Sequence, residues 1–408
     1  MRASGDRSQG IDRVDRVDRS IRPIDRSIAS IERALDVARA TTMGARVAFA
    51  FAFAFAFAFA FAFAFAFAFA FASTTSESRA TSANDDAKTC ASATIVGAFA
   101  DVHGDFNALR RAMSLLRAIE DADDDTDTDT GDVRWKRRKH ANDLGKLVVV
   151  QLGDVVDRGD ESARATAAGE RLRAEARERG DEFVTLLGNH ELMVLQRDLR
   201  FVGRREVVAL GREALKETMG NGDFVGLGLR AYYYAGARAW NKMFSKNEEL
   251  GRVLREKPVA VIRGRGRCAT VFVHAGLTPA HFASDDGPDV DGLNARVRAL
   301  IDVDVVDKAT DGLLGNDGPL WTRELSQGDE SVACEYAELV TRRLGVRRIV
   351  VGHTVTKSGV IETRCGGLIH MIDVGMSAAY GGSPSAWMCD EDEGPVAISS
   401  SGARTPLE

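Results

Sequence analysis

The sequence predicts an α/β fold built around parallel strands. Residues 93–100, 146–152 and 182–187 are short, apolar and followed at once by a polar, glycine-containing loop, which is the pattern of a buried strand. Residues 107–120 and 163–179 have the composition and the apolar spacing of helices. Because strand, loop and helix follow one another repeatedly, we expect parallel βαβ units with helices packed on the sheet.

Further strands are predicted toward the C-terminus, at residues 270–274, 348–352, 368–373 and 386–389. Residues 199–257 are helical in composition and hold no metal-binding motif, so we expect them to form a helical cap that shapes a substrate groove. The acidic tract 121–132 and the basic run 135–139 are most simply a solvated insertion, and a basic docking site is the alternative.

Length and charge limit the organisation of the chain and its partners. A chain of 408 residues ordinarily holds two or three domains, but one catalytic domain over residues 93–400 accounts for every motif. The net charge of -6, from 54 basic and 60 acidic residues, argues against a nucleic-acid partner. The five cysteines are odd in number and include no Cys-x-x-Cys pair, so we expect reduced, inert thiols rather than a disulfide scaffold or a structural zinc site.

The region before residue 93 differs from the rest of the chain. Residues 1–46 are polar and repetitive and are predicted to be disordered. Residues 47–72 are mostly a Phe-Ala repeat with 12 of the 20 phenylalanines, and residues 73–92 form a Ser/Thr/Ala-rich linker. The apolar run is long enough to cross a bilayer as a helix, for which about 20 residues suffice. A targeting segment that starts at Met43, an aggregation-prone strand and an expanded repeat without function are the alternatives.

Residues that bind cations or phosphate follow the predicted strands. They are Asp101 and His103 after the first strand, Asp154, Asp157 and Arg158 after the second, Asn189 and His190 after the third, and His274 and His353 after two later strands. Four of the seven histidines lie in these loops. Because ligand sites in open α/β sheets lie beyond the carboxyl ends of the strands, we expect these loops to converge on one crevice.

The residue types indicate a metal centre. Carboxylates and neutral imidazoles bind iron, manganese or zinc, and an asparagine adds a neutral oxygen. Asp101, His103, Asp154, Asn189, His274 and His353 are more ligands than one tetrahedral ion needs, but they suit two ions that share a carboxylate. Paired ions about 3.5–4 Å apart recur in phosphatases and nucleases.

The chain resembles the calcineurin-like metallophosphoesterases, in their phosphoprotein phosphatase branch. The resemblance rests on five ordered motifs: Asp-x-His-Gly from residue 101, Gly-Asp-x-x-Asp-Arg-Gly from 153, Gly-Asn-His-Glu from 188, His-Ala-Gly from 274 and Gly-His-Thr from 352. Within that branch, residues 318–323 and 373–382 resemble the Shewanella-like protein phosphatases. The resemblance covers residues 93–388 and implies a central β-sandwich of mixed strands, flanked by helices.

This resemblance implies a role for each candidate site residue. Asp101 and His103 would hold one metal, Asn189, His274 and His353 a second, and Asp154 would bridge them. The two divalent or trivalent ions would be manganese, iron or zinc, and a hydroxide that bridges them is the implied nucleophile.

Four further residues carry the implied chemistry on the substrate. His190 would donate a proton to the leaving oxygen, and Asp157 would hold the imidazole in the productive tautomer. Arg158 would clamp the phosphate oxygens, with Arg323 as a second clamp.

The implied activity is that of a metal-dependent phosphatase whose substrate is a phosphoprotein carrying phosphoserine, phosphothreonine or phosphotyrosine. Since members of the resembling group occur in plastids and in the cytosol, we expect a plastid location, with a cytoplasmic or a membrane-anchored protein as alternatives. A dinucleoside polyphosphate hydrolase of the same fold is an alternative function. A catalytically silent, membrane-tethered scaffold is a second alternative, but such a protein does not require His190 together with all six ligands. A phosphodiesterase is a third alternative, but Arg158 and Arg323 match a dianionic phosphate monoester better.

The remaining aromatic and histidine residues are predicted to be structural. We expect His140, His281 and His370 to lie in the core or face solvent. Residues 232–234 and Trp240 are expected to pack in the core, and a lining of a substrate groove is the alternative. No Cys-x5-Arg motif is present, which excludes a cysteine-based tyrosine phosphatase, and no Gly-x4-Gly-Lys loop for a nucleotide is present.

Overall fold

The computed structural model describes residues 94–121, 133–136, 145–219, 228–282, 290–308 and 312–408. The predicted N-terminal segments, 1–46, 47–72 and 73–92, lie outside the described residues, as does His140. Within the ranges given, no helix combines the length and the apolar character that a membrane crossing requires.

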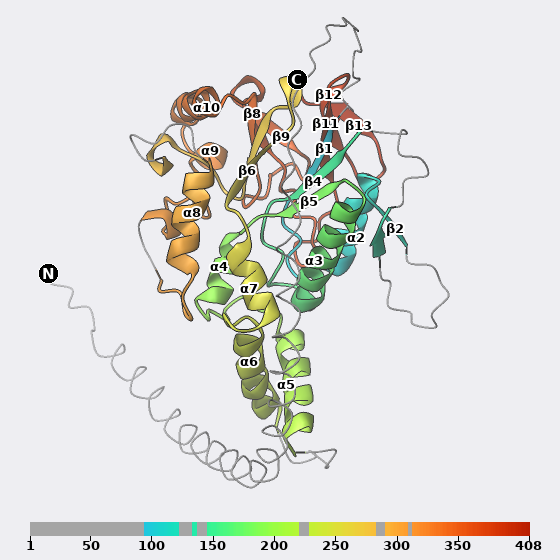
Figure 1. The fold of residues 1–408 in the computed structure, drawn as a ribbon, viewed down its shortest axis with the longest axis vertical. Helices are drawn as coiled ribbons and strands as arrows, with labels where there is room; N and C mark the ends of the chain where they lie inside the picture. The colour runs from blue at the N-terminus through green and yellow to red at the C-terminus, as the bar shows by residue number, and fades with distance from the viewer. Residues whose placement is uncertain (1–93, 122–132, 137–144, 220–227, 283–289, 309–311) are drawn as a thin grey trace, which may run out of the picture. The chain divides into compact units, whose positions relative to one another are not determined.

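One sheet contains six strands in the order β13-β12-β11-β1-β4-β5 (Figure 1). One half consists of the three parallel strands predicted first, β1 (Ile95–Phe99), β4 (Leu147–Gln151) and β5 (Glu182–Thr185). The antiparallel strands β11 (Ala386–Asp390), β12 (Gly394–Ile398) and β13 (Arg404–Pro406) continue the sheet beside β1. The sheet therefore runs a few residues past position 400.

The second sheet contains five strands in the order β6-β7-β8-β10-β9. The predicted strands β7 (Thr270–Val273), β8 (Arg348–Val351) and β10 (Ile369–Met371) are parallel to one another. The edge strands β6 (Ala260–Arg263) and β9 (Glu362–Arg364) are antiparallel to their neighbours, and we did not predict them.

The two sheets pack face to face and form the predicted β-sandwich. Side chains alternate along β7, so that Phe272 enters the core shared with the six-stranded sheet while Val271 and Val273 enter a second core under the helices. The ring of Phe272 lies 5.5 Å from that of Trp387 in β11. The indole of Trp387 donates to Nδ1 of His370, a fully buried residue of β10 that is structural, as predicted.

Helices cover the outer faces of both sheets (Figure 1). The helices α2 (Phe106–Leu115) and α3 (Ser162–Glu178) pack on the six-stranded sheet, and α8 (Val290–Ile301) and α10 (Glu330–Leu344) pack on the five-stranded sheet. Shorter elements complete the fold: α4 (Asn189–Leu195), α9 (Glu324–Gln327), η1 (Gly266–Cys268), η2 (Pro279–His281), η3 (Gly312–Leu314) and η4 (Cys365–Gly367). His281 is buried and bonded to the carbonyl oxygen of Asp317, which confirms a structural role.

The segment after α2 departs from prediction. The helix predicted over residues 107–120 ends early, and Arg117 has a positive φ of 54°. The chain then forms β2 (Ile119–Asp121), which pairs with β3 (Val133–Trp135). The prediction of a solvated insertion is wrong for Trp135, which is 1% exposed and donates from its indole to Asp181. Residues 122–132 and 137–139 of the predicted insertion lie outside the described residues. Burial of so large an aromatic ring outweighs the polar character of its neighbours.

The described residues between 199 and 257 contain the helices α5 (Arg204–Met219), α6 (Leu229–Met243) and α7 (Glu249–Glu256), in agreement with the predicted helical composition. The helices α5 and α6 lie side by side as a hairpin that extends away from the two sheets (Figure 1). They approach so closely that a Cβ at position 211 would lie 1.7 Å from the carbonyl oxygen of Tyr232, so the contact requires Gly211. Trp240 is 1% exposed and lies in the core, as predicted, but Tyr234 is 48% exposed, so core packing is wrong for that residue.

The prediction of reduced cysteines is wrong for the described residues. Cys268 is bonded to Cys389, and Cys334 is bonded to Cys365. The partners are 121 and 31 residues apart in the sequence, so their proximity depends on the fold and leaves no local pattern.

Candidate active site

The predicted loops meet at one place, where those after β1, β4 and β5 face those after β7 and β8. The carboxylate of Asp154, which is 2% exposed, lies at the centre. Its Oδ2 is 3.7 Å from His103 Nε2 and 3.9 Å from His190 Nε2, and its Oδ1 is 3.4 Å from His274 Nε2. Strands of both sheets therefore deliver imidazoles to one shared carboxylate.

Asp101 and His103 flank Asp154 on one side. His103 Nε2 lies 3.7 Å from Asp101 Oδ2. His103 Nδ1 lies 3.2 Å from the carbonyl oxygen of Val156. An Nδ1–H that donates to a carbonyl leaves Nε2 as the nitrogen that faces the carboxylates, which is the usual arrangement of a metal-binding histidine.

Asn189, His274 and His353 lie on the other side of Asp154. His274 Nε2 is 2.9 Å from Asn189 Oδ1, and its Nδ1 is 2.8 Å from a backbone carbonyl oxygen. His353 turns Nε2 to the carbonyl oxygen of Trp321 at 3.1 Å, which leaves Nδ1 to bind an ion. Asp154, His274 and His353 can each offer one ligand atom within 4.8 Å of the others.

The backbone at these positions adopts conformations that are unusual for residues with a side chain. The angle φ is positive at His103 (45°), Asp154 (53°), Asp157 (70°), Arg158 (68°) and His353 (64°). Such strain persists only where the surrounding structure fixes it, and it concentrates at functional sites. Its presence at five predicted site residues supports a common functional site.

Gly188 and Glu191 fix the loop that carries Asp154. A Cβ at Gly188 would lie 2.2 Å from Asp154 Oδ1, so only glycine fits there. The carboxylate of Glu191 accepts from the backbone N–H groups of Gly188, Asp154, Val155 and Val156. Glu191 had no predicted role, and its position in the Gly-Asn-His-Glu motif is explained by this support.

His190 and Asp157 form a buried pair beside Asp154. His190 Nδ1 lies 2.6 Å from Asp157 Oδ2, and the Asp157 side chain is fully buried. Burial acts to lower the pKa of His190, but the charge of Asp154 and the bond to Asp157 outweigh it and raise that pKa above its ordinary value. His190 also forms a group with His103 and Asp154 that could hold a metal ion, so the geometry allows both a ligand and a proton donor.

The two predicted phosphate clamps border the cluster. Arg158 is exposed, and its guanidinium carbon lies 4.0 Å from the ring centroid of Phe201 and 5.9 Å from that of Tyr380. Arg323 is exposed and directly precedes α9. The pKa of His353 is lowered to about 3 by burial, by His274 and, to a smaller degree, by the charge of Arg323.

Comparison with known proteins agrees with this geometry. The model of the calcineurin-like phosphoesterases matches residues 95–357. The chain belongs to the calcineurin-like phosphoesterase family. This phosphoesterase is 27% identical over 304 residues to Shewanella-like protein phosphatase 2 of Arabidopsis thaliana, covering 69% of its own length and 71% of the relative. It is 23% identical over 287 residues to Shewanella-like protein phosphatase 1 of Plasmodium berghei, covering 69% and 66%.

A solved structure shares the fold of this phosphoesterase. It is the cold-active protein-tyrosine phosphatase of a psychrophilic Shewanella species, with a TM-score of 0.57 and 22% sequence identity. The similarity covers 77% of this chain and 80% of that protein. It supports the predicted sandwich architecture.

The donor set of the phosphoesterase fits bound cations. The pKa of Asp101 is raised well above its ordinary value by burial and by the charges of Asp373 and Asp154, and burial with the charge of Asp154 raises the pKa of Asp373 to about 7. Carboxylates gathered in this way are stabilised as anions when cations lie among them. Burial lowers the pKa of His103 to about 4, so its imidazole is neutral at pH 7 and able to bind a metal.

Besides Glu191, the residues Asp373 and Tyr380 of the site were not predicted. Asp373 is 2% exposed and directly follows Ile372 at the end of the predicted strand 368–373, so the rule that placed ligands after strands applied to it. Tyr380 lies with its hydroxyl 3.5 Å from His103 Nε2. Both belong to the segment 373–382, which indicated a family resemblance but in which no site residue was predicted.

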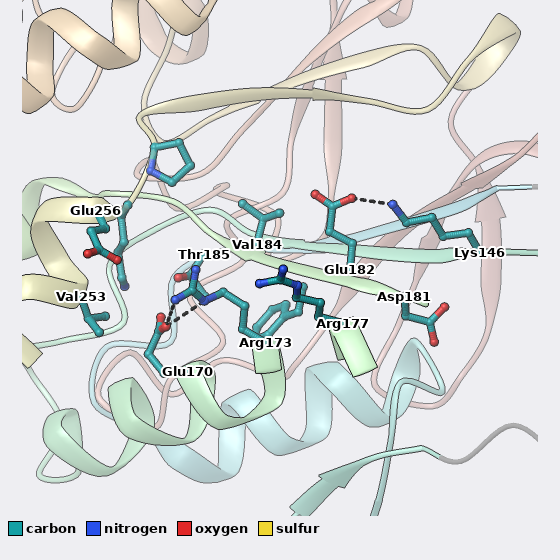
Figure 2. A pocket seen from close by; sticks show the side chains of 13 residues that line it. Lys146, Glu170, Arg173, Arg177, Asp181, Glu182, Val184, Thr185, Val253 and Glu256 are labelled. Carbon is teal, nitrogen blue, oxygen red and sulfur yellow. Dashed lines mark hydrogen bonds and ion pairs between the residues drawn. The ribbon is translucent and has the colours of Figure 1, made fainter. Parts of the chain in front are cut away.

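A separate cavity of about 390 Å³ runs along β5 between α3 and α7 (Figure 2). None of the predicted site residues lines it. Two pairs of charged side chains lie there, since Arg173 donates to Glu170 at 2.8 Å and Lys146 donates to Glu182 at 2.9 Å (Figure 2). We therefore assign the phosphoesterase chemistry to the cluster around Asp154.

Proposed function

We propose that this chain is a metal-dependent phosphoprotein phosphatase that hydrolyses phosphomonoesters. The observation that carries the proposal is the gathering of five candidate ligands around a sixth, the buried carboxylate of Asp154, with the pair His190–Asp157 and the cation Arg158 beside it. Scattered surface polar residues would not share burial, strained backbone and a common partner.

Two metal ions would be held on either side of Asp154. Asp101 and His103 would bind one ion, and Asn189, His274 and His353 would bind the other. Bound ions of this kind make a coordinated water a nucleophile at neutral pH and neutralise charge on the phosphate oxygens. Manganese, iron and zinc all accept this mixture of carboxylate, imidazole and amide ligands.

His190 would supply the proton that the leaving oxygen needs. Asp157 accepts from Nδ1, so the opposite nitrogen, Nε2, is the one that faces Asp154 and the reaction. This arrangement fixes both the tautomer and the orientation of the imidazole. A leaving alkoxide, which is strongly basic, depends on such a donor.

Arg158 and Arg323 would bind the phosphate from the solvent side. Both side chains are exposed at the border of the cluster, where a phosphate group on a protein surface can reach them. A guanidinium presents paired N–H donors that match two phosphate oxygens. The phosphatase names of the relatives from Arabidopsis thaliana and Plasmodium berghei support the same substrate class for this chain.

Parallel activity assays with phosphopeptides and with a dinucleoside polyphosphate test the proposal. The manganese-loaded protein should release phosphate from phosphoserine, phosphothreonine or phosphotyrosine peptides, and an Asp154→Asn variant should not, because the shared carboxylate is lost. Diadenosine tetraphosphate in a parallel assay distinguishes the alternative hydrolase. Cleavage of the nucleotide alone would contradict a phosphoprotein as the substrate. A lack of turnover with every ester would contradict the proposal that the protein is an enzyme.

A further inference from the structure

We propose that Phe201 is a positioning residue that holds the guanidinium of Arg158 where it binds phosphate. This inference rests on the proposed function and adds a residue that belongs to none of the sequence motifs. Phe201 lies between α4 and α5, at the root of the helical insertion that carries the α5–α6 hairpin.

Phe201 contacts Arg158 through both its backbone and its ring. The backbone N–H of Arg158 donates to the carbonyl oxygen of Phe201 at 2.7 Å. The guanidinium carbon lies 4.0 Å from the ring centroid, within the range of a cation–π interaction. One contact fixes the main chain and the other fixes the far end of the same residue, so together they restrict a long and otherwise flexible side chain.

An aromatic partner suits a residue that must bind an anion. A carboxylate would accept hydrogen bonds from the N–H groups of the guanidinium, and these are the same groups that donate to a bound phosphate. The ring contacts the flat face and leaves those edges available. Among the described residues, the two carboxylates of the same loop, Asp154 and Asp157, pair with the imidazole of His190. The only rings that the described part of the chain places near its guanidinium carbon are Phe201 and, more distantly, Tyr380.

The chain around Phe201 is fixed to the strained loop that carries Arg158. Gly203 packs on the loop so closely that a Cβ there would lie 2.1 Å from the carbonyl oxygen of Gly159. Glu206 of α5 accepts from the backbone N–H groups of Ser162 and Ala163. The root of the insertion therefore has a fixed position against the loop.

The ring of Phe201 also lies 5.3 Å from the ring of His190. One side chain from outside the motifs thus borders both the candidate proton donor and the candidate phosphate clamp. The stronger contact is the one to Arg158, since it combines a hydrogen bond with a ring contact.

Substitutions that separate the π face from simple volume test this role. Phe201→Leu keeps an apolar side chain but removes the ring, whereas Phe201→Tyr keeps the ring. In the manganese-loaded protein we expect Phe201→Leu to raise the dissociation constant of inorganic phosphate, measured by titration calorimetry, roughly 3- to 30-fold. Phe201→Tyr should stay close to the wild type. Tyr234→Leu, on the exposed part of α6, is the matched control and should change nothing.

A double-mutant cycle shows whether the effect passes through Arg158. In an Arg158→Ala background, Phe201→Leu should alter phosphate affinity by less than about twofold, because the group that it positions is absent. An equal loss in both backgrounds, or equal affinities for the Leu and Tyr variants, would overturn the inference. Thermal unfolding midpoints of all variants control for folding. Failure of the proposed function would appear separately, as a wild-type protein that binds phosphate but does not hydrolyse phosphopeptides.

Discussion

Replacement of His190 by alanine separates the two roles that its position allows. Its Nδ1 is 2.6 Å from Asp157 and its Nε2 is 3.9 Å from Asp154, so the imidazole is either a proton donor or a metal ligand. A positioned acid contributes about 10²- to 10⁴-fold in rate, which is roughly 3–5 kcal/mol of barrier. As a proton donor, His190 is needed for a serine leaving group and much less for p-nitrophenolate, which leaves without a proton.

The assay compares kcat for a phosphoserine peptide and for p-nitrophenyl phosphate in the wild type and in His190→Ala. We expect a loss of about 10²- to 10⁴-fold with the peptide and of less than about tenfold with the aryl ester, because a good leaving group needs little protonation. The metal content of the variant, measured by mass spectrometry, should equal that of the wild type. Loss of a metal, or an equal loss of rate with both substrates, would refute the role of proton donor.

Three further predictions follow from buried groups. Asp157→Asn should lower kcat roughly 10- to 150-fold in steady-state assays, the equivalent of about 1.5–3 kcal/mol for a hydrogen bond to a charged group; unchanged kcat would contradict the pairing with His190. Burial lowers the pKa of His370 from 6.5 to about 3, so below pH 6.5 the unfolded chain takes up a proton that the folded chain does not. The contribution of neutral His370 to the free energy of unfolding is therefore complete above pH 6.5 and declines toward pH 3. Urea titrations should show a shallower decline of this free energy for His370→Gln, and an identical decline would be inconsistent with the shift. The double replacement Cys268→Ala and Cys389→Ala should lower the unfolding free energy by roughly 2–5 kcal/mol in urea titrations, whereas no change would mean that the disulfide does not stabilise the fold.

The parts of the fold that depend on local patterns could be predicted from the sequence. The strands β1, β4 and β5 are short apolar runs that end in polar loops, and they occur where we expected them. The edge strand β9 is three residues long and polar, so its pairing depends on neighbours that are distant in the sequence. The edge strand β6 does carry a short apolar run, Ala-Val-Ile, and this signal was missed. The short strand β3 escaped notice for the same reason, since burial of Trp135 requires Asp181 as a distant partner.

The residues of the candidate site also fall into those that the sequence indicates and those that only the structure reveals. Residues such as Asp101 and His190 stand in motifs after strands, where position and residue type together indicate chemistry. Phe201 carries no such signal, because an aromatic residue in a helical segment has the composition of a core residue. Its contact with Arg158 joins positions 43 residues apart through the strained turn at Arg158, where φ is 68°. Only the three-dimensional arrangement relates the two.

Anomalous diffraction from manganese-loaded crystals locates bound ions relative to Asp154. We propose that Asp154 is shared by two ions, one bound also by His103 and the other also by His274. We expect two anomalous peaks about 3.5–4 Å apart that flank this carboxylate. Peaks remote from Asp154, or a fully loaded crystal without any peak at this cluster, would contradict it.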